Sequence, residues 1–182
     1  MLYHASKQAG LKELRPQIST HGKAYVYAIN NRLTALLFGA PKDDFDILMD
    51  ESNGTPVIYE CYPDALKSVY WGKSCSLYSL SEDGFLANRT GWDPELVCER
   101  AVSVVCEERI ENIYEEIIRA IQAGGCIFHP YSEDTEYQDF LRDELSERIK
   151  QFGITEAQMQ ADPRFELYFN RLLHEENKGE HT

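Results

Sequence analysis

Two short stretches decide how this chain is interpreted, Leu2-Tyr3-His4-Ala5-Ser6 and Ala24-Tyr25-Val26-Tyr27-Ala28. Aromatic and β-branched residues gather in these stretches, and polar, Gly- or Pro-bearing segments flank them, which predicts two β-strands. Alternate side chains of a strand point to opposite faces, so both tyrosines of the second strand are expected on one face and Val26 in the core. His4 of the first strand can then face a tyrosine of the second across a cleft.

The rest of the pattern predicts an α+β protein. Further strands are expected at residues 45–49, 56–61, 75–80 and 102–106. The Asn-Gly pair at 53 and 54 predicts a hairpin between the first two of them. Helices are expected at residues 32–38, at about 133–150, and from Thr155 and Asp162 onward, whereas residues 66–70 fit either a helical turn or a strand. We therefore expect a β-rich core at residues 1–128 and a helical extension at residues 129–182 that packs on it.

An isoleucine stripe predicts one more helix in the middle of the chain. Its members are spaced by three, four and four residues, as on one face of an amphipathic helix: Ile110, Ile113, Ile117 and Ile121. Acidic residues near Glu107 suit the positive N-terminal end of a helix. We therefore expect this helix to begin at Glu107 and to end at the glycines 124 and 125.

The composition disfavours several classes of function. The 182 residues include 31 acidic and 18 basic side chains, which give a formal net charge of −13. Tight nucleic-acid binding depends on Lys and Arg that displace counterions from phosphates, so no nucleic-acid partner is expected. No apolar run approaches the ~20 residues of a membrane span, and no signal-peptide pattern opens the chain. We expect a soluble, cytoplasmic protein with no membrane partner.

The cysteines and the search for phosphate-binding motifs point to no further class of function. The five cysteines are widely spaced without a Cys-x-x-Cys pair, so reduced and mostly buried thiols are expected. Cys61 or Cys126 with His129 is a weak candidate for nucleophilic catalysis, because this spacing does not itself arrange a base next to a thiol. The acidic helix lacks calcium-binding spacing, and no Gly-rich phosphate cradle of a kinase or dehydrogenase occurs. No metal site is predicted.

Three short motifs carry a resemblance to a known family. Residues 2–6, followed by Tyr27-Ala28 and an Ala-containing helix, resemble the opening of small bacterial ADP-ribosyltransferase-fold proteins, which have a Tyr-His-Gly-Ser/Thr strand and a Tyr-Ala-Thr strand. Residues 92–97, ahead of the strand at 102–105, look like the third motif, in which an acidic residue precedes a Pro-Val strand. RNA 2′-phosphotransferases and rifampin ADP-ribosyltransferases are more distant relatives. The resemblance covers roughly residues 1–115 and implies a mostly antiparallel, split β-sheet core.

The resemblance also implies an activity and a set of site residues. Enzymes of this family break the nicotinamide–ribose bond of NAD and pass ADP-ribose to a protein or small-molecule acceptor. Carried over to this sequence, His4 would bind the adenosine-side ribose, Tyr27 would stack on nicotinamide, and Glu95 would engage the nicotinamide ribose. Ser6 would bind the nucleotide through its hydroxyl group. Such a bond breaks through an oxocarbenium-like transition state, as glycosides do.

Neighbouring residues leave alternatives open. Tyr25 shares a face with Tyr27 and would take the stacking role if the register differed by two residues. Asp93 and Glu99 compete with Glu95 for the acidic position. A diphosphate binds Arg or Lys donors, and the candidates are Arg15, Lys23 and Lys73.

Each site residue also has an ordinary structural interpretation. His4 is equally expected as a core histidine whose ring nitrogens are satisfied by backbone groups. Tyr27 is one of eleven tyrosines, and Glu95 lies in a region where a carboxylate is usually just solvated. His21, beside Gly22, is expected as an exposed loop histidine.

Two functions are compatible with the sequence. The first is an NAD-dependent mono-ADP-ribosyltransferase. The second is a non-catalytic scaffold of the same fold that binds a partner through its C-terminal helices. Ala5 and Ile29 favour the scaffold, because the family usually has Gly at the first position, where a Cβ hinders close approach to a nucleotide, and Thr or Ser at the second. The net charge disfavours an RNA 2′-phosphotransferase.

Overall fold

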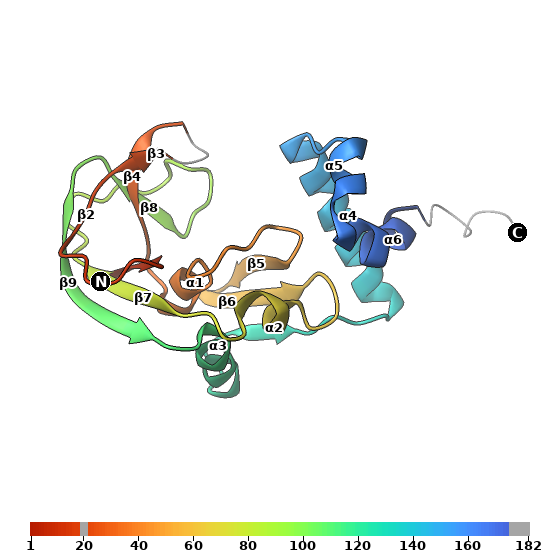
Figure 1. Cartoon of the computed structure of the whole chain (residues 1–182), viewed down its shortest axis with the longest axis horizontal. Helices are drawn as coiled ribbons and strands as arrows, with labels where there is room; N and C mark the ends of the chain where they lie inside the picture. Colours follow the sequence, from red (N-terminus) through yellow and green to blue (C-terminus); the bar gives the residue numbers. More distant parts are fainter. Residues whose placement is uncertain (19–21, 175–182) are drawn as a thin grey trace, which may run out of the picture.

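The computed structural model describes residues 1–18 and 22–174 and has the predicted α+β class. Its sheets are mostly antiparallel, and six α-helices lie within the described residues. Figure 1 shows a larger sheet at one end of an elongated molecule, a smaller sheet in the middle and the C-terminal helices at the other end. None of the helices in the described ranges is long and apolar enough to cross a membrane.

The larger sheet has seven strands in the order β2-β9-β7-β1-β4-β3, with β8 also paired to β4. The strands are β1 (Leu2–Ser6), β2 (Glu13–Leu14), β3 (Gln17–Ile18), β4 (Ala24–Ile29), β7 (Cys75–Leu80), β8 (Glu95–Cys98) and β9 (Val102–Ile110). All of their pairings are antiparallel. Val26 is buried in an apolar cluster with side chains of β1, β7 and β8, as its place in the alternation predicts.

The larger sheet opens between β1 and β4, and we call this opening the fork. Among the described residues the two strands share one register pair, Tyr3 with Ile29. Beyond it, β1 stays paired with β7 and β4 stays paired with β8. The His4 ring fills part of the gap, because its Nδ1 atom lies 2.8 Å from the carbonyl oxygen of Tyr27.

The smaller sheet contains the predicted hairpin, formed by β5 (Ile47–Ser52) and β6 (Thr55–Glu60). Asn53 and Gly54 both have positive φ, 51° and 78°, as a tight two-residue turn between antiparallel strands requires. A third strand, β10 (Ile127–His129), returns parallel to β6. This short strand follows the glycines at 124 and 125.

Three short helices lie between the strands. Asn31 caps α1 (Arg32–Leu36), because its side-chain oxygen accepts hydrogen bonds from the N–H groups of Leu33 and Thr34. The ambiguous segment at 66–70 belongs to α2 (Ala65–Tyr70), whose Leu66 N–H donates to the buried Glu60 carboxylate at 2.8 Å. Three isoleucines of the stripe, Ile113, Ile117 and Ile121, lie on α3 (Ile113–Gln122), whereas Ile110 ends β9.

The predicted start of α3 at Glu107 is wrong. Residues 107–110 continue β9 and pair with β7, and the helix begins only at Ile113. The Glu107 carboxylate accepts hydrogen bonds from Gly10 N–H and from the hydroxyl groups of Ser76 and Tyr78. Long-range strand pairing therefore outweighs the local helical spacing.

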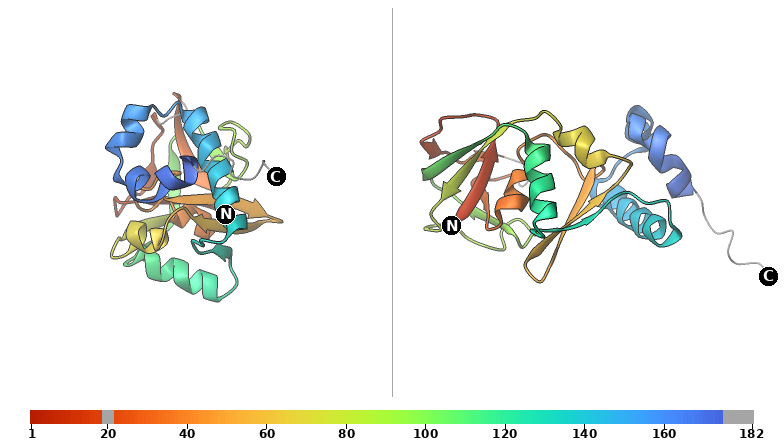
Figure 2. Two further views of the ribbon diagram at one scale, coloured as in Figure 1. Left: turned by 90° about the vertical axis from the view of Figure 1, so that its right-hand side faces the viewer. Right: turned by 90° about the horizontal axis from the view of Figure 1, so that it is seen from below.

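The C-terminal helices are α4 (Thr135–Phe152), α5 (Glu156–Ala161), the π-helical segment η1 (Phe165–Phe169) and α6 (Asn170–His174). Thr155 forms a capping box with Gln158 at the start of α5. Leu141 and Leu145 of α4 and Phe165 and Phe169 of η1 are buried in the same apolar cluster as residues of β5, β6 and α3. Seen from below in Figure 2, these helices lie at the opposite end of the molecule from the N-terminus.

An ion cluster joins the C-terminal helices to the loop before β5. The guanidinium group of Arg164 lies 2.7 Å from carboxylate oxygens of both Asp43 and Asp46, and 2.6 Å from Asp162. Phe45 in the same loop packs on the rings of Phe165 and Phe169. Charge pairing and apolar packing therefore fix this part of the chain together.

Candidate functional site

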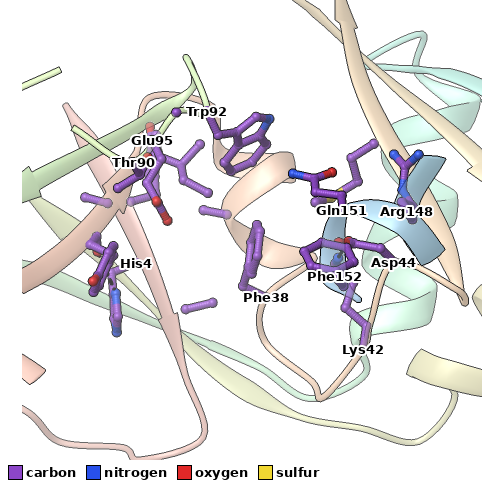
Figure 3. A pocket seen from close by; sticks show the side chains of 18 of the residues that line it. His4, Phe38, Lys42, Asp44, Thr90, Trp92, Glu95, Arg148, Gln151 and Phe152 are labelled. Atoms are coloured by element: carbon purple, nitrogen blue, oxygen red, sulfur yellow. Dashed lines mark hydrogen bonds and ion pairs between the residues drawn. The ribbon is translucent and has the colours of Figure 1, made fainter. Parts of the chain in front are cut away.

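A cavity of about 800 Å³ lies between the fork and α4. Figure 1 shows β4 and β8 on one side and α4 on the other, with α1 and β5 between them. The close view in Figure 3 shows His4, Thr90 and Glu95 at one end, Phe38 in the middle, and Lys42, Arg148 and Phe152 at the other end. We call these the strand end and the helix end. The volume is in the range of small-molecule and cofactor sites.

The strand end brings together the three predicted catalytic residues. His4 comes from β1, Tyr27 from β4 and Glu95 from the first position of β8, and all three line the cavity. The register explains the meeting, because Tyr3 pairs with Ile29 and Ile29 also pairs with Glu95. Strand pairing thus carries side chains that are distant in sequence to one end of one cavity.

His4 is partly buried, and its ring has a defined hydrogen bond. A carbonyl oxygen only accepts, so the Nδ1–H group of His4 donates to Tyr27 O. Burial lowers the pKa of His4, and the hydrogen bond to Tyr27 opposes that shift. The ring is therefore favoured in its neutral form, in which Nε2 is a hydrogen-bond acceptor.

Glu95, rather than its acidic neighbours, lines the cavity. Asp93 and Glu99 are absent from the lining, and the Glu99 carboxylate lies 2.6 Å from Lys23 Nζ on the surface. The backbone N–H of Glu95 donates to the carbonyl oxygen of Trp92, which ends the loop just before β8.

A second cavity of about 430 Å³ adjoins the first, and His4 and Tyr27 line both. The remaining predicted cofactor-binding residues, Ser6, Arg15 and Tyr25, line the second cavity. Tyr25 is buried and meets Tyr27 edge to face, with ring centroids 5.9 Å apart. The two tyrosines thus share a face of β4, as predicted, but only Tyr27 reaches the first cavity.

The helix end contains residues that sequence reasoning missed. Glu144, Glu147, Arg148, Gln151 and Phe152 of α4 line it, and their spacing of three, one, three and one forms a single face of the helix. Phe38 packs on Trp92 in the middle of the cavity, with ring centroids 5.8 Å apart. The spacing on α4 can be seen in the sequence, but nothing in the sequence indicated that this face lines the same cavity as β1 and β4.

Other predicted candidates lie elsewhere. Lys73 lines neither cavity, and His21 lies outside the described residues. Burial raises the pKa of the Cys61 and Cys126 thiols, which disfavours a nucleophilic thiolate. The His129 ring stacks on Tyr59 with centroids 4.5 Å apart. No group of His, Cys, Asp and Glu suited to a metal ion occurs within residues 1–18 and 22–174.

Comparison with known proteins identifies no relative. The chain matches no protein-family model, no curated protein and no solved structure.

Proposed function

We propose that this protein cleaves the nicotinamide–ribose bond of NAD and transfers ADP-ribose to an acceptor. One observation carries the proposal: His4, Tyr27 and Glu95, which the resemblance to ADP-ribosyltransferase-fold proteins implies as a set, line the same end of one cavity. The split, mostly antiparallel sheet around the fork is consistent with that fold type. A pocket of cofactor size with a few convergent polar groups is the usual form of an active site.

The two adjoining cavities provide room for an extended dinucleotide. In this proposal the nicotinamide ribose lies at the strand end beside Glu95, and the nicotinamide ring stacks on Tyr27. The adenosine side continues past His4 into the second cavity, where Arg15 donates to the diphosphate. Arg15 is highly exposed and pairs with Glu13 at 3.0 Å, so it can reorient toward a ligand.

The neutral His4 ring fits a ribose-binding role. Its Nδ1–H group is held by the Tyr27 carbonyl, which fixes the ring orientation and leaves Nε2 to accept a hydrogen bond from a ribose hydroxyl. The same contact couples the positions of β1 and β4. His4 therefore has a structural and a ligand-binding part in the proposal.

The reaction assigns a charge-stabilising role to Glu95. The C1′–N bond breaks with its electron pair leaving on nicotinamide, and positive charge develops on the ribose. The Glu95 carboxylate stabilises that charge by holding the ribose hydroxyls and by its own negative charge. A nucleophilic acceptor or water then forms the new bond to C1′ and loses its proton. No oxidant or metal is consumed in this step.

The first prediction concerns Glu95. Glu95→Gln keeps the shape of the side chain and removes its charge, so we expect about a 100-fold loss of nicotinamide release from NAD, with NAD binding retained. Release is measured by chromatography and binding by thermal shift. His4→Ala should instead weaken NAD binding. The substitution removes the imidazole ring, which links β1 to β4 and in this proposal binds the ribose.

Glu99→Gln is the matched control, because Glu99 follows β8 but lies outside the cavity. It should leave nicotinamide release within about twofold of the wild type, since exposed ion pairs contribute little. Full activity in Glu95→Gln would contradict the role of this carboxylate. Absence of NAD binding in the wild type would favour the non-catalytic scaffold, for which Ala5 in the cavity wall is the supporting observation.

A further inference from the structure

Lys42 lies in the loop between α1 and β5 and lines the helix end of the large cavity. Its side chain is only 5% exposed. The other described lysines are all exposed: Lys7, Lys12, Lys23, Lys67, Lys73 and Lys150. A single amine is therefore withdrawn from bulk water and placed at a ligand-sized cavity.

The Lys42 amine lies beside aromatic rings and near carboxylates. Its Nζ atom lies 5.1 Å from the centroid of the Phe38 ring, and Phe152 lies at the same end of the cavity in Figure 3. The closest carboxylate oxygen is that of Asp44, at 3.8 Å, which is beyond hydrogen-bond distance. Within the described residues the structure contains no hydrogen bond donated by this amine. Such a donor is costly to bury unless a ligand pairs with it.

Opposing electrostatic effects act on this amine. Burial lowers the pKa of Lys42, and the negative charges of Asp44, Asp46 and Asp43 oppose the shift. The nearby Cys61 thiol stays neutral because burial raises its pKa. The charged residues of α4 that line the same cavity are Glu144, Glu147 and Arg148. Burial has the larger effect, so a greater fraction of Lys42 is uncharged at neutral pH than of an exposed lysine.

We propose that Lys42 is a nucleophilic amine that forms an imine with a small aldehyde or ketone bound at the helix end of the cavity. The proposal rests on the burial of this side chain, its place on the cavity wall and the carboxylate next to it, and it goes beyond NAD cleavage. Desolvated lysines in apolar pockets are the usual source of such nucleophiles. The apolar rings of Phe38 and Phe152 suit a ligand with a small hydrocarbon body.

The chemistry balances without an oxidant or reductant. The Nζ lone pair attacks the carbonyl carbon, and the carbonyl oxygen takes up a proton to give a carbinolamine. The proton taken up by this oxygen comes from nitrogen, so the carbinolamine keeps one N–H; loss of its hydroxyl group and this last amine proton as one molecule of water leaves a neutral C=N bond. The Asp44 carboxylate, 3.8 Å from Nζ, is the nearest general base, and in the proposal it accepts a proton from nitrogen and returns one to the departing oxygen through one water molecule.

The test traps the imine in the full-length protein without NAD. The protein is incubated with limiting butyraldehyde at several pH values from 6.5 to 9 and reduced with sodium borohydride, and alkylated lysines are quantified by peptide mass spectrometry. At pH 7 we expect severalfold more adduct at Lys42 than at Lys67. The adduct at Lys42 should also level off at a lower pH than the adduct at Lys67.

Lys67 is the matched internal comparison, because its amine also lies over an aromatic ring, 5.8 Å from the centroid of Trp71, but is exposed. Both sites are measured in one wild-type sample, so the result does not depend on the folding of a variant. Lys42→Arg should remove the Lys42 adduct and leave the Lys67 adduct unchanged. Equal or lower labelling of Lys42 across the pH range would overturn the proposal, whether or not the protein turns over NAD.

Discussion

The ionisation of His4 links a single residue to stability. Burial lowers its pKa, so between the folded value and the ordinary value of about 6.5 the unfolded chain binds more protons than the folded protein. The free energy of unfolding should therefore decrease as the pH falls below about 6.5 and should not depend on His4 above it. In His4→Asn, the side-chain amide can still donate to the Tyr27 carbonyl but does not titrate.

Urea unfolding at pH 5 and pH 7 measures this difference. The wild type should lose more stability between the two pH values than His4→Asn. The same pH dependence in both proteins would show that the imidazole is not held neutral. A parallel loss of NAD affinity below pH 6.5 is expected, because protonation removes the acceptor at Nε2.

At the residue scale, the strand end of the cavity was predictable and the helix end was not. His4 and Tyr27 sit in short strands with strong β-propensity, and local pattern was enough to single them out. Lys42 stands in the sequence Pro41-Lys42-Asp43-Asp44, which is typical of a charged, exposed turn. Its side chain is instead buried at a cavity that α4 also lines, about one hundred residues later in the chain, and no local pattern indicates such an arrangement.

At the element scale, Arg164 holds the C-terminal helices to the loop before β5. Hydrogen bonds from Arg164 lower the pKa of Asp162; for Asp43, burial acts in the opposite direction, but hydrogen bonds from Arg164 and Phe45 N–H still leave its pKa lowered. The folded pKa values lie below the unfolded ones, so the ion cluster stabilises the protein above about pH 4 and loses this contribution as the pH falls through the folded values.

Arg164→Gln tests this element directly. We expect a loss of about 2 kcal/mol at pH 7, between the values typical of exposed and buried ion pairs, because the Arg164 side chain is 22% exposed. The difference in the free energy of unfolding between wild type and variant should be smaller at pH 3 than at pH 7, and thermal unfolding at both pH values measures this difference. Arg119→Gln is the control, since Arg119 is exposed and pairs with Glu116 on its own helix. The same difference in stability at both pH values would show that the charges of the cluster do not account for its contribution.

Most elements were predictable because their signals are local. The Asn53-Gly54 turn, the Asn31 cap and the Thr155 capping box each depend on a few neighbouring residues. The helix predicted from Glu107 failed because the partner of residues 107–110 is β7, about thirty residues earlier. Likewise, α2 begins where the Glu60 side chain accepts from Leu66 N–H, which a propensity-based prediction does not include.

At the scale of the whole molecule, the C-terminal helices and the smaller sheet share one apolar cluster. We therefore expect a single cooperative unfolding transition, not separate transitions for residues 1–128 and 129–174. Leu145→Ala, at a fully buried position of α4, should cost about 2–5 kcal/mol and shift that whole transition.

Leu167→Ala is the matched control, because Leu167 is 67% exposed although Phe165 and Phe169 of the same segment are buried. It should change the stability by less than about 0.5 kcal/mol. Calorimetry distinguishes the outcomes. Two separate peaks, with Leu145→Ala moving only one of them, would show that the extension unfolds by itself.

Because of the fork, residues that do not contact a ligand can influence the geometry of the site. β1 and β4 are joined at the Tyr3–Ile29 pair and diverge beyond it. The apolar cluster that contains Leu2, Val26 and Leu80 packs next to this pair. Larger or smaller side chains in this cluster change the angle between the two strands and therefore the distance from His4 to Glu95. Substitutions in this buried cluster therefore offer a way to adjust the width of the cavity while every side chain that lines it stays the same.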